Sequence, residues 1–246
     1  MSQDREMKIF MASAAQKARR YEESVNFFKA AVLLDPKLSE SEQKLFLQVY
    51  KSCVDLRRND ILFISSIKEY QQCKKCTLKV DALDIYQKKL YNELAAFCYE
   101  VISLIDNFIL VKASSPEETV LYLKTKADFY RYLAETLSEQ DGFPLSSKAH
   151  ELYLEAINTS KSSILPTHPV YCNTILNYSV YLHEILKHKS DALIIAEDFV
   201  EKIKDLEQID QEPVSEETHQ IIQRIKQNVD MWKKESNNNS DSDAES

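Results

Sequence analysis

Apolar residues recur at intervals of three and four along most of the chain, which is the spacing of one buried face of an α-helix. The clearest stripe predicts a helix over about 77–111 and consists of Leu83, Tyr86, Leu90, Leu94, Phe97, Val101, Leu104 and Phe108. A second stripe predicts a helix over about 39–70; Ser39 or Ser41 can cap its start, and Glu42 follows Ser39 as a capping box requires. Shorter stripes predict helices over about 117–138, 169–187, 190–207 and 215–233.

Prolines lie between these stripes and divide the chain into about nine helices. The segment Asp141-Gly142-Phe143-Pro144 is the strongest turn signal. Gly142 is the only glycine, so Rossmann, P-loop, protein-kinase and hairpin-rich β folds are excluded. We expect an all-α fold, with one helical domain over 1–234 and a disordered, acidic, serine-rich tail over 235–246.

The formal net charge of -8 is uneven, because Glu235–Ser246 holds four acids and no base. The rest of the chain is nearly balanced, and it lacks the basic field expected for nucleic-acid binding. The N-terminus is charged rather than apolar, so we expect a cytoplasmic protein without membrane insertion. The five cysteines are interpreted as free thiols, and the lone Cys73–Cys76 pair has no further ligands for a metal.

Signals for catalysis are weak. His183 and His188 are five residues apart, so they do not share a helix face as the histidines of an HExxH zinc motif do. No nucleophile, base or oxyanion loop occurs at a recognisable spacing, and we expect no enzyme activity, metal or cofactor. Residues 15–36 resemble half of a tetratricopeptide repeat, which leaves a helical-repeat scaffold as the alternative architecture.

Two groups of basic residues have the spacing of an anion site. Lys51 and Arg58 are seven apart on one helix face. Lys124, Asp128 and Arg131 follow at i, i+4 and i+7, where the acid can hold the arginine fork toward a phosphate, and Tyr132 is adjacent. Solvated helix faces carry the same spacing, so position alone leaves both interpretations open.

The order of several separated motifs resembles the 14-3-3 proteins from about residue 5 to Trp232. The motifs are Tyr50-Lys51 with Arg57-Arg58 and Ser65-Ser66-Ile67, Tyr122–Asp128 with Tyr130–Glu135, and Pro166–Pro169 with Leu176–Val180 and Glu184–Leu186. The resemblance implies nine antiparallel helices around a cup-like groove in each subunit. It also implies an adaptor that binds phosphoserine or phosphothreonine segments of client proteins and performs no chemistry.

The same resemblance assigns residue roles. The phosphate ligands it implies are Lys51, Arg58, Arg131 and Tyr132. The peptide-binding groove it implies consists of Lys124, Asp128, Leu176, Asn177, Val180, Glu184, Ile221, Asn228 and Trp232. It implies a homodimer, or a heterodimer with related subunits, through Arg20, Glu23, Tyr86, Lys89 and Glu93.

Several positions depart from the family pattern, including the altered opening of the first motif at Gln43–Gln48. Leu62 replaces an arginine beside the phosphate ligands, and Gln220 and Arg224 replace leucines of the groove wall. Asp60 and Ala14 differ at positions that affect dimerisation in the family. We therefore keep one functional alternative, a tetratricopeptide-like scaffold that binds unphosphorylated peptides.

Overall fold

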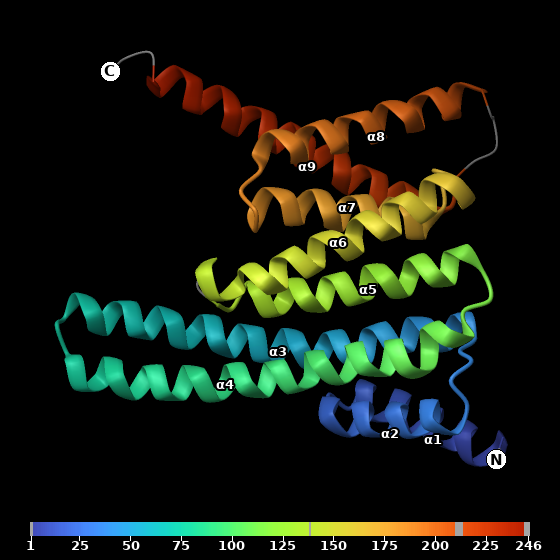
Figure 1. Cartoon of the computed structure of the whole chain (residues 1–246), viewed down its shortest axis with the longest axis horizontal. Coiled ribbons are helices and arrows are strands. Elements are labelled where there is room, and N and C mark those ends of the chain that lie inside the picture. Colours follow the sequence, from blue (N-terminus) through green and yellow to red (C-terminus); the bar gives the residue numbers. More distant parts are fainter. Residues whose placement is uncertain (1, 138, 210–213, 244–246) are drawn as a thin grey trace. The chain divides into compact units, whose positions relative to one another are not determined.

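The computed structural model describes residues 2–137, 139–209 and 214–243 (Figure 1). Within these ranges the chain is helical and contains no strand. The helices are α1 Ser2–Lys17, α2 Tyr21–Leu34, α3 Glu40–Cys73, α4 Thr77–Leu104, α5 Pro116–Ala134, α6 Glu139–Ser163, α7 Pro169–Glu184, α8 Lys189–Ile209 and α9 Glu216–Asp243. A π-helical turn, Ile105–Ile109, and a 3-10 turn, Leu110–Lys112, continue α4. The predicted all-α class is confirmed.

The chain forms two compact units. Unit 1 consists of Met1–Ser114 and Tyr132–Leu145, and unit 2 consists of Ser115–Arg131 and Ser146–Ser246. Helix α5 contributes to both, because the boundary passes between Arg131 and Tyr132.

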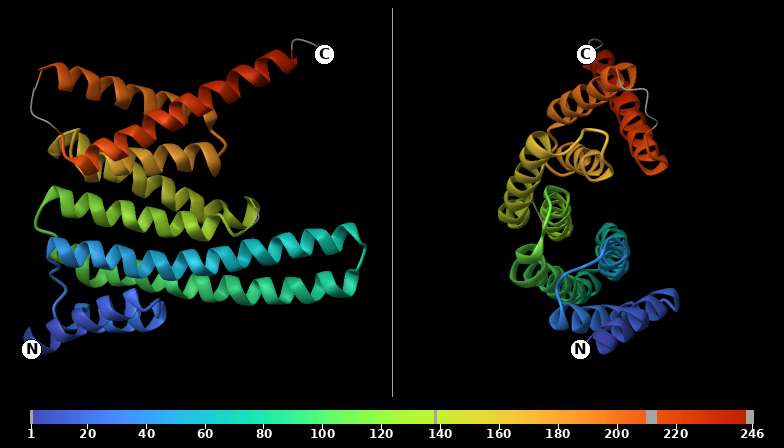
Figure 2. Two further views of the ribbon diagram at one scale, coloured as in Figure 1. Left: turned by 180° about the vertical axis from the view of Figure 1, so that it is seen from behind. Right: turned by 90° about the vertical axis from the view of Figure 1, so that its right-hand side faces the viewer.

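In unit 1, α1 packs on α2, α2 on α3, and α3 on α4. Figures 1 and 2 show α3 and α4 side by side as a long antiparallel pair. The Ser39 side chain accepts from the Glu42 backbone, and the Glu42 carboxylate accepts from the Ser39 backbone, so the predicted capping box is present. The core centres on Phe46, whose ring lies 5.6 Å from that of Phe28 and 5.1 Å from that of Tyr50.

The stripe that predicts α4 is buried mainly in its C-terminal part. Leu90, Leu94 and Val101 are buried, whereas Tyr86 is 47% exposed. The tip of the α3–α4 pair extends beyond α1 and α2, so those helices do not cover the first turns of α4 (Figures 1 and 2). Cys98, which was not part of the predicted stripe, is also buried and belongs to the core face of α4.

By length and composition alone, one stretch among the described residues could cross a membrane. This stretch is Thr77–Lys112, with a mean hydropathy of 1.8 over its most apolar window. A core helix of a soluble protein passes the same test, and α4 packs against α3 over its length with Leu94, Cys98 and Val101 fully buried. We interpret the stretch as a core helix.

Three helices end on basic residues in the left-handed region, where glycine is usual. These residues are Arg19 (φ 60°), Lys75 (φ 55°) and Lys187 (φ 57°). At the first, the Arg20 N–H donates to the Ala15 carbonyl at 2.9 Å, which closes the end of α1. A side chain in this region costs about 1–2 kcal/mol, so the chain makes glycine-type helix caps at some expense in stability.

The turn predicted at Asp141–Pro144 is wrong. These residues lie in α6, and the chain turns just after α5, where Thr136 and Leu137 donate backbone bonds to Leu133 and Ala134. Gly142 serves close packing instead, because a Cβ there would lie 3.0 Å from the Ala134 carbonyl oxygen. Pro144 lies inside α6, where it provides no backbone N–H.

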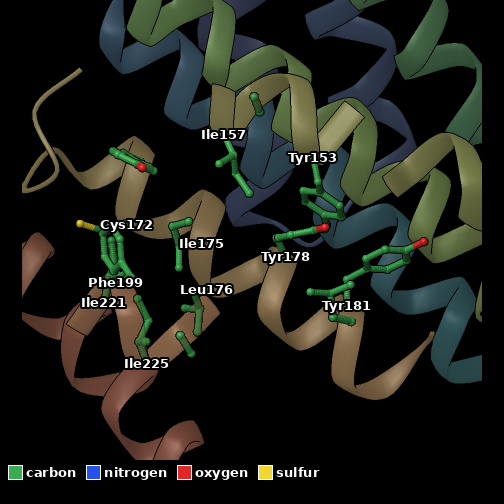
Figure 3. Close-up of a cluster of buried hydrophobic side chains, with 14 of the residues drawn as sticks. Tyr153, Ile157, Cys172, Ile175, Leu176, Tyr178, Tyr181, Phe199, Ile221 and Ile225 are labelled. Carbon is green, nitrogen blue, oxygen red and sulfur yellow. The ribbon is translucent and has the colours of Figure 1, made fainter. Parts of the chain in front are cut away.

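The core of unit 2 lies among α5, α6, α7, α8 and α9. Figure 3 shows Tyr153, Tyr178 and Tyr181 gathered in one part of it, with ring centroids 5.4–6.3 Å apart. The other part consists of Cys172, Ile175, Leu176, Phe199, Ile221 and Ile225. The predicted stripes of α7, α8 and α9 supply most of these side chains.

The last helix is longer than predicted, since α9 runs to Asp243. Residues 244–246 of the predicted tail and Pro213 lie outside the described residues. Disorder of the acidic tail in solution stays a prediction, as does a single domain over 1–234.

Candidate functional site

In unit 1, Arg58 is held on three sides. Its guanidinium lies 4.5 Å from the centroid of the Tyr132 ring, donates to the Glu135 carboxylate, and donates to Asp55 Oδ1 at 3.3 Å. The side chain is about a quarter exposed. The structure thus brings together two of the predicted phosphate ligands, Arg58 and Tyr132, with one carboxylate on each terminal nitrogen of the guanidinium.

The neighbouring arginine has a different role. Arg57 is buried, donates to Glu22 Oε1 at 2.5 Å, and stacks 4.0 Å from the centroid of the Phe97 ring. It therefore stabilises the packing of α2, α3 and α4. The predicted ligand Lys51 lies on α3 two turns before Arg58, and its side chain is exposed.

In unit 2, a buried carboxylate organises the second basic group. Asp128 accepts from Lys124 Nζ at 2.8 Å, from the Tyr153 hydroxyl at 2.5 Å, and from Asn177 Nδ2 at 2.9 and 3.1 Å. Arg131 Nη2 lies 3.8 Å from the same carboxylate. The predicted i, i+4, i+7 arrangement on α5 therefore forms, and it also gathers Asn177 from α7.

Two cations, Lys124 and Arg131, lie beside the one carboxylate of this cluster. Burial alone would raise the pKa of the Asp128 carboxyl, but the charges of Lys124 and Arg131 outweigh burial and hold this pKa below its ordinary value. Burial and the adjacent Asp128 charge raise the pKa of the Tyr153 phenol well above its usual range. Tyr153 therefore stays a neutral donor to Asp128, and its oxygen accepts from Arg131 Nε at 3.4 Å.

Two residues of these clusters were missed from the sequence, Tyr153 and Glu135. Tyr153 lies 22 residues after Arg131, and Glu135 lies 77 residues after Arg58. Both contacts arise from tertiary packing, so helical spacing gave no signal for the partner. Glu135 stands one helical turn after Arg131 in the sequence, but in the structure it pairs with Arg58 of α3.

The remaining predicted groove residues belong to unit 2. Leu176, Ile221 and Trp232 are buried, Val180 and Asn228 are partly exposed, and Glu184 is exposed. Glu184 and Trp232 meet at His183: the His183 and Trp232 rings stack 4.5 Å apart, and His183 Nδ1 lies 2.8 Å from Glu184 Oε1. This stack joins the end of α7 to α9.

The predicted dimer residues lie on the surface of unit 1, where Tyr86, Lys89 and Arg20 are exposed. Arg20 donates to Glu23 of the same chain, so a partner subunit would have to compete for both side chains. The predicted pairs Arg20–Glu93 and Glu23–Lys89 stay a prediction. Among the described residues, no cluster of His, Cys, Asp and Glu could hold a metal.

A family model described as "14-3-3 protein" matches residues 11–233. The chain belongs to the 14-3-3 family. It is 32% identical to 14-3-3 protein zeta of Bombyx mori, with 100% of this chain and 98% of the relative covered. It is 33% identical to 14-3-3-like protein 2 of Caenorhabditis elegans (94% and 93% covered) and 32% identical to 14-3-3 protein 7 of Solanum lycopersicum (94% and 92% covered).

Membership of the 14-3-3 family supports the role of a phosphopeptide-binding adaptor that binds client proteins. Because the match covers nearly the whole chain, it replaces the tetratricopeptide-like architecture. The two clusters around Arg58 and Asp128 contain residues that the sequence motifs single out.

Proposed function

We propose that this chain binds phosphoserine or phosphothreonine in extended segments of client proteins. In unit 1 the proposed phosphate ligands are Lys51, Arg58 and Tyr132. In unit 2, Arg131 is the residue that we assign to phosphate recognition. The observation that carries the proposal is that Arg58 is already placed by Tyr132 and Glu135 with its fork on an anion. We also propose that the protein binds these segments without catalysing a reaction.

A phosphate at Arg58 would compete with carboxylates that the guanidinium already bonds. The two terminal nitrogens of the guanidinium now bond two monoanionic carboxylates, Glu135 and Asp55, whereas a phosphoserine carries close to two negative charges and three acceptor oxygens. A charge-assisted hydrogen bond contributes about 1.5–3 kcal/mol. Because the arginine is ordered before the ligand arrives, less side-chain entropy is lost on binding.

In unit 2, the Asp128 cluster supports a role for Asn177 in holding the client backbone. Its Nδ2 donates to both Asp128 oxygens, which fixes the amide and leaves Oδ1 as the atom that can accept a backbone N–H. Such a bond does not depend on the client side chain. The phosphate therefore provides affinity, and the asparagine provides orientation.

Substitution of Arg58 tests the proposal. Arg58→Ala should weaken binding of a phosphoserine peptide at least tenfold, equivalent to about 1.4 kcal/mol. Arg5→Ala is the matched control, because Arg5 is also a partly buried arginine of unit 1 in an ion pair, with Glu42 at 2.6 Å. Equal loss in both variants, measured by calorimetric titration, would refute the assignment of Arg58 to the phosphate.

The proposal also includes a homodimer, or a heterodimer with related subunits, in the cytoplasm. The exposure of Arg20, Tyr86 and Lys89 supports a contact surface at these residues. Light scattering on the purified protein should give twice the mass of one chain, and Lys89→Glu should lower that mass. A mass of one chain for the unmodified protein would contradict the dimer.

A further inference from the structure

Unit 1 contains a hollow beside Arg58 that the phosphate ligands do not explain. It has a volume of about 600 Å³ and lies between α3, α4 and the turn after α5. Its lining includes Ile61 and Leu62 from α3, Tyr91 from α4, and Glu135 and Leu137 from the turn. We call it the Leu62 hollow.

The wall of the Leu62 hollow includes an exposed apolar side chain. Leu62 is 59% exposed, while Ile61 beneath it is buried. Two polar side chains of the wall bond one another, since Gln87 Nε2 donates to Ser65 Oγ at 2.7 Å. Exposed leucine surface around a concavity gains free energy when an apolar group covers it.

The charged groups around the hollow are mostly neutralised in place. Glu135 pairs with Arg58, and Asp84 pairs with Lys68. Lys88 is a further cation of the wall, and its side chain is exposed. Before a phosphate binds, the hollow therefore offers little net charge. A phosphate on Arg58 leaves Glu135 and Lys88 in the wall as two charges of opposite sign, so the exposed Leu62 surface favours an apolar side chain over an acidic or basic one.

The hollow continues directly from the proposed phosphate ligand. Glu135 belongs to both, because it lines the hollow and accepts from Arg58. Leu62 follows Arg58 by one helical turn, an axial rise of about 6 Å. An extended peptide rises about 3.3 Å per residue, so a segment whose phosphate rests on Arg58 reaches Leu62 within about two residues.

We propose that the Leu62 hollow binds an apolar side chain of the client, about two residues from the phosphoresidue, and so selects among phosphorylated segments. This inference rests on the proposed function. The chemical class of ligand is a phosphopeptide with a leucine-sized side chain at that position. The residue that determines specificity is Leu62.

The test uses a short alanine-based phosphoserine peptide and variants with leucine, glutamate or arginine at single positions within about three residues of the phosphoserine. Leucine at one of these positions should tighten binding about tenfold relative to alanine, equivalent to 1.4 kcal/mol. Glutamate and arginine at the same position should give no such gain. Calorimetric titration of the full chain provides the affinities.

Leu62→Arg should abolish the leucine preference while the alanine-based phosphopeptide still binds. Phe63→Arg is the matched control, because Phe63 is the next residue on α3, is 67% exposed, and is not part of the hollow. Phe63→Arg should keep the preference. Leu62→Ala, which adds no charge, should reduce the preference and so separates lost contact from new repulsion.

The outcomes distinguish this inference from the proposed function. Phosphate-dependent binding without a leucine preference at any position would overturn the inference and leave the proposed function intact. Loss of the preference in Phe63→Arg as well as in Leu62→Arg would also overturn it. If the phosphorylated and unphosphorylated peptides bind equally, the proposed function fails and the inference fails with it.

Discussion

Substitution of Asp128 by asparagine should destabilise the protein far more than an equally short ion pair on the surface would suggest. Asp128 and Lys124 are 2.8 Å apart with side chains 8% and 10% exposed. Lys148 and Glu151 are also 2.8 Å apart, but their side chains are 49% and 66% exposed. The two ion pairs therefore have the same distance between their charged atoms and differ in the burial of their side chains.

The magnitude follows from what each change leaves behind. Asp128→Asn leaves the Lys124 ammonium buried without its countercharge, which costs about 3–5 kcal/mol. Glu151→Gln leaves Lys148 in water, where the pair contributes about 0–1 kcal/mol. With a urea dependence of about 1–3 kcal/mol per molar, Asp128→Asn should lower the unfolding midpoint by about 1 M or more.

Urea denaturation of the two variants measures this difference in the free energy of unfolding. Adding Lys124→Met to Asp128→Asn should recover at least about 1 kcal/mol, because the unpaired ammonium is removed. Equal losses in Asp128→Asn and Glu151→Gln, or no recovery in the double variant, would refute the electrostatic account of this cluster.

The same cluster predicts the dependence of stability on pH. The folded-state pKa of Asp128 is lowered, so its contribution is fully present above the unfolded pKa of about 3.9 and is lost as pH falls through the folded pKa. The unmodified protein should therefore lose stability below about pH 4 more steeply than Asp128→Asn. Parallel curves in the acid range would contradict the lowered pKa.

Three further predictions concern single side chains. Tyr153→Phe removes the hydroxyl that bonds Asp128 and Arg131, so it should lower the free energy of unfolding by about 1–3 kcal/mol. It should also weaken phosphopeptide binding several-fold. Unchanged affinity would contradict a role of Tyr153 in positioning Arg131. Ser39→Ala breaks the capping box and should lower the free energy of unfolding by about 1 kcal/mol, measured by urea titration. The affinity for the phosphopeptide, measured by calorimetry, should not change. No loss of stability would contradict the cap. Iodoacetamide should label exposed Cys73 before Cys172, since burial raises the pKa of the Cys172 thiol to about 12, and peptide mapping that finds Cys172 first would contradict the packing around it.

The sequence predicted those features that depend on residues close together in the chain. Periodicity predicted the helices, and the Ser39–Glu42 pair predicted the start of α3, because both depend on spacing within one turn or face. The turn at Asp141–Pro144 was wrong because glycine there serves an approach to Ala134, which adjacent residues do not reveal. A similar limit applies to the tip of α4, where the exposure of Tyr86 depends on how far α1 and α2 extend.

In the candidate site, too, the sequence predicted contacts within one helix but not contacts between helices. Spacing on α5 correctly placed Lys124 and Arg131 around Asp128. It could not supply Tyr153 or Glu135, whose partners lie on other helices. Motif resemblance assigns these cations to the phosphate, which stays a prediction, and packing determines which side chains hold them before a ligand binds.

The measurement that tests the central claim most directly is a titration of the full chain with one phosphoserine peptide and with its unphosphorylated twin, repeated with Arg131→Ala. The account predicts a preference for the phosphorylated peptide of about a hundredfold or more, equivalent to about 2.8 kcal/mol, and its loss in Arg131→Ala. Equal affinity for the two peptides, or a preference that survives the substitution, would contradict phosphate recognition at the assigned residues.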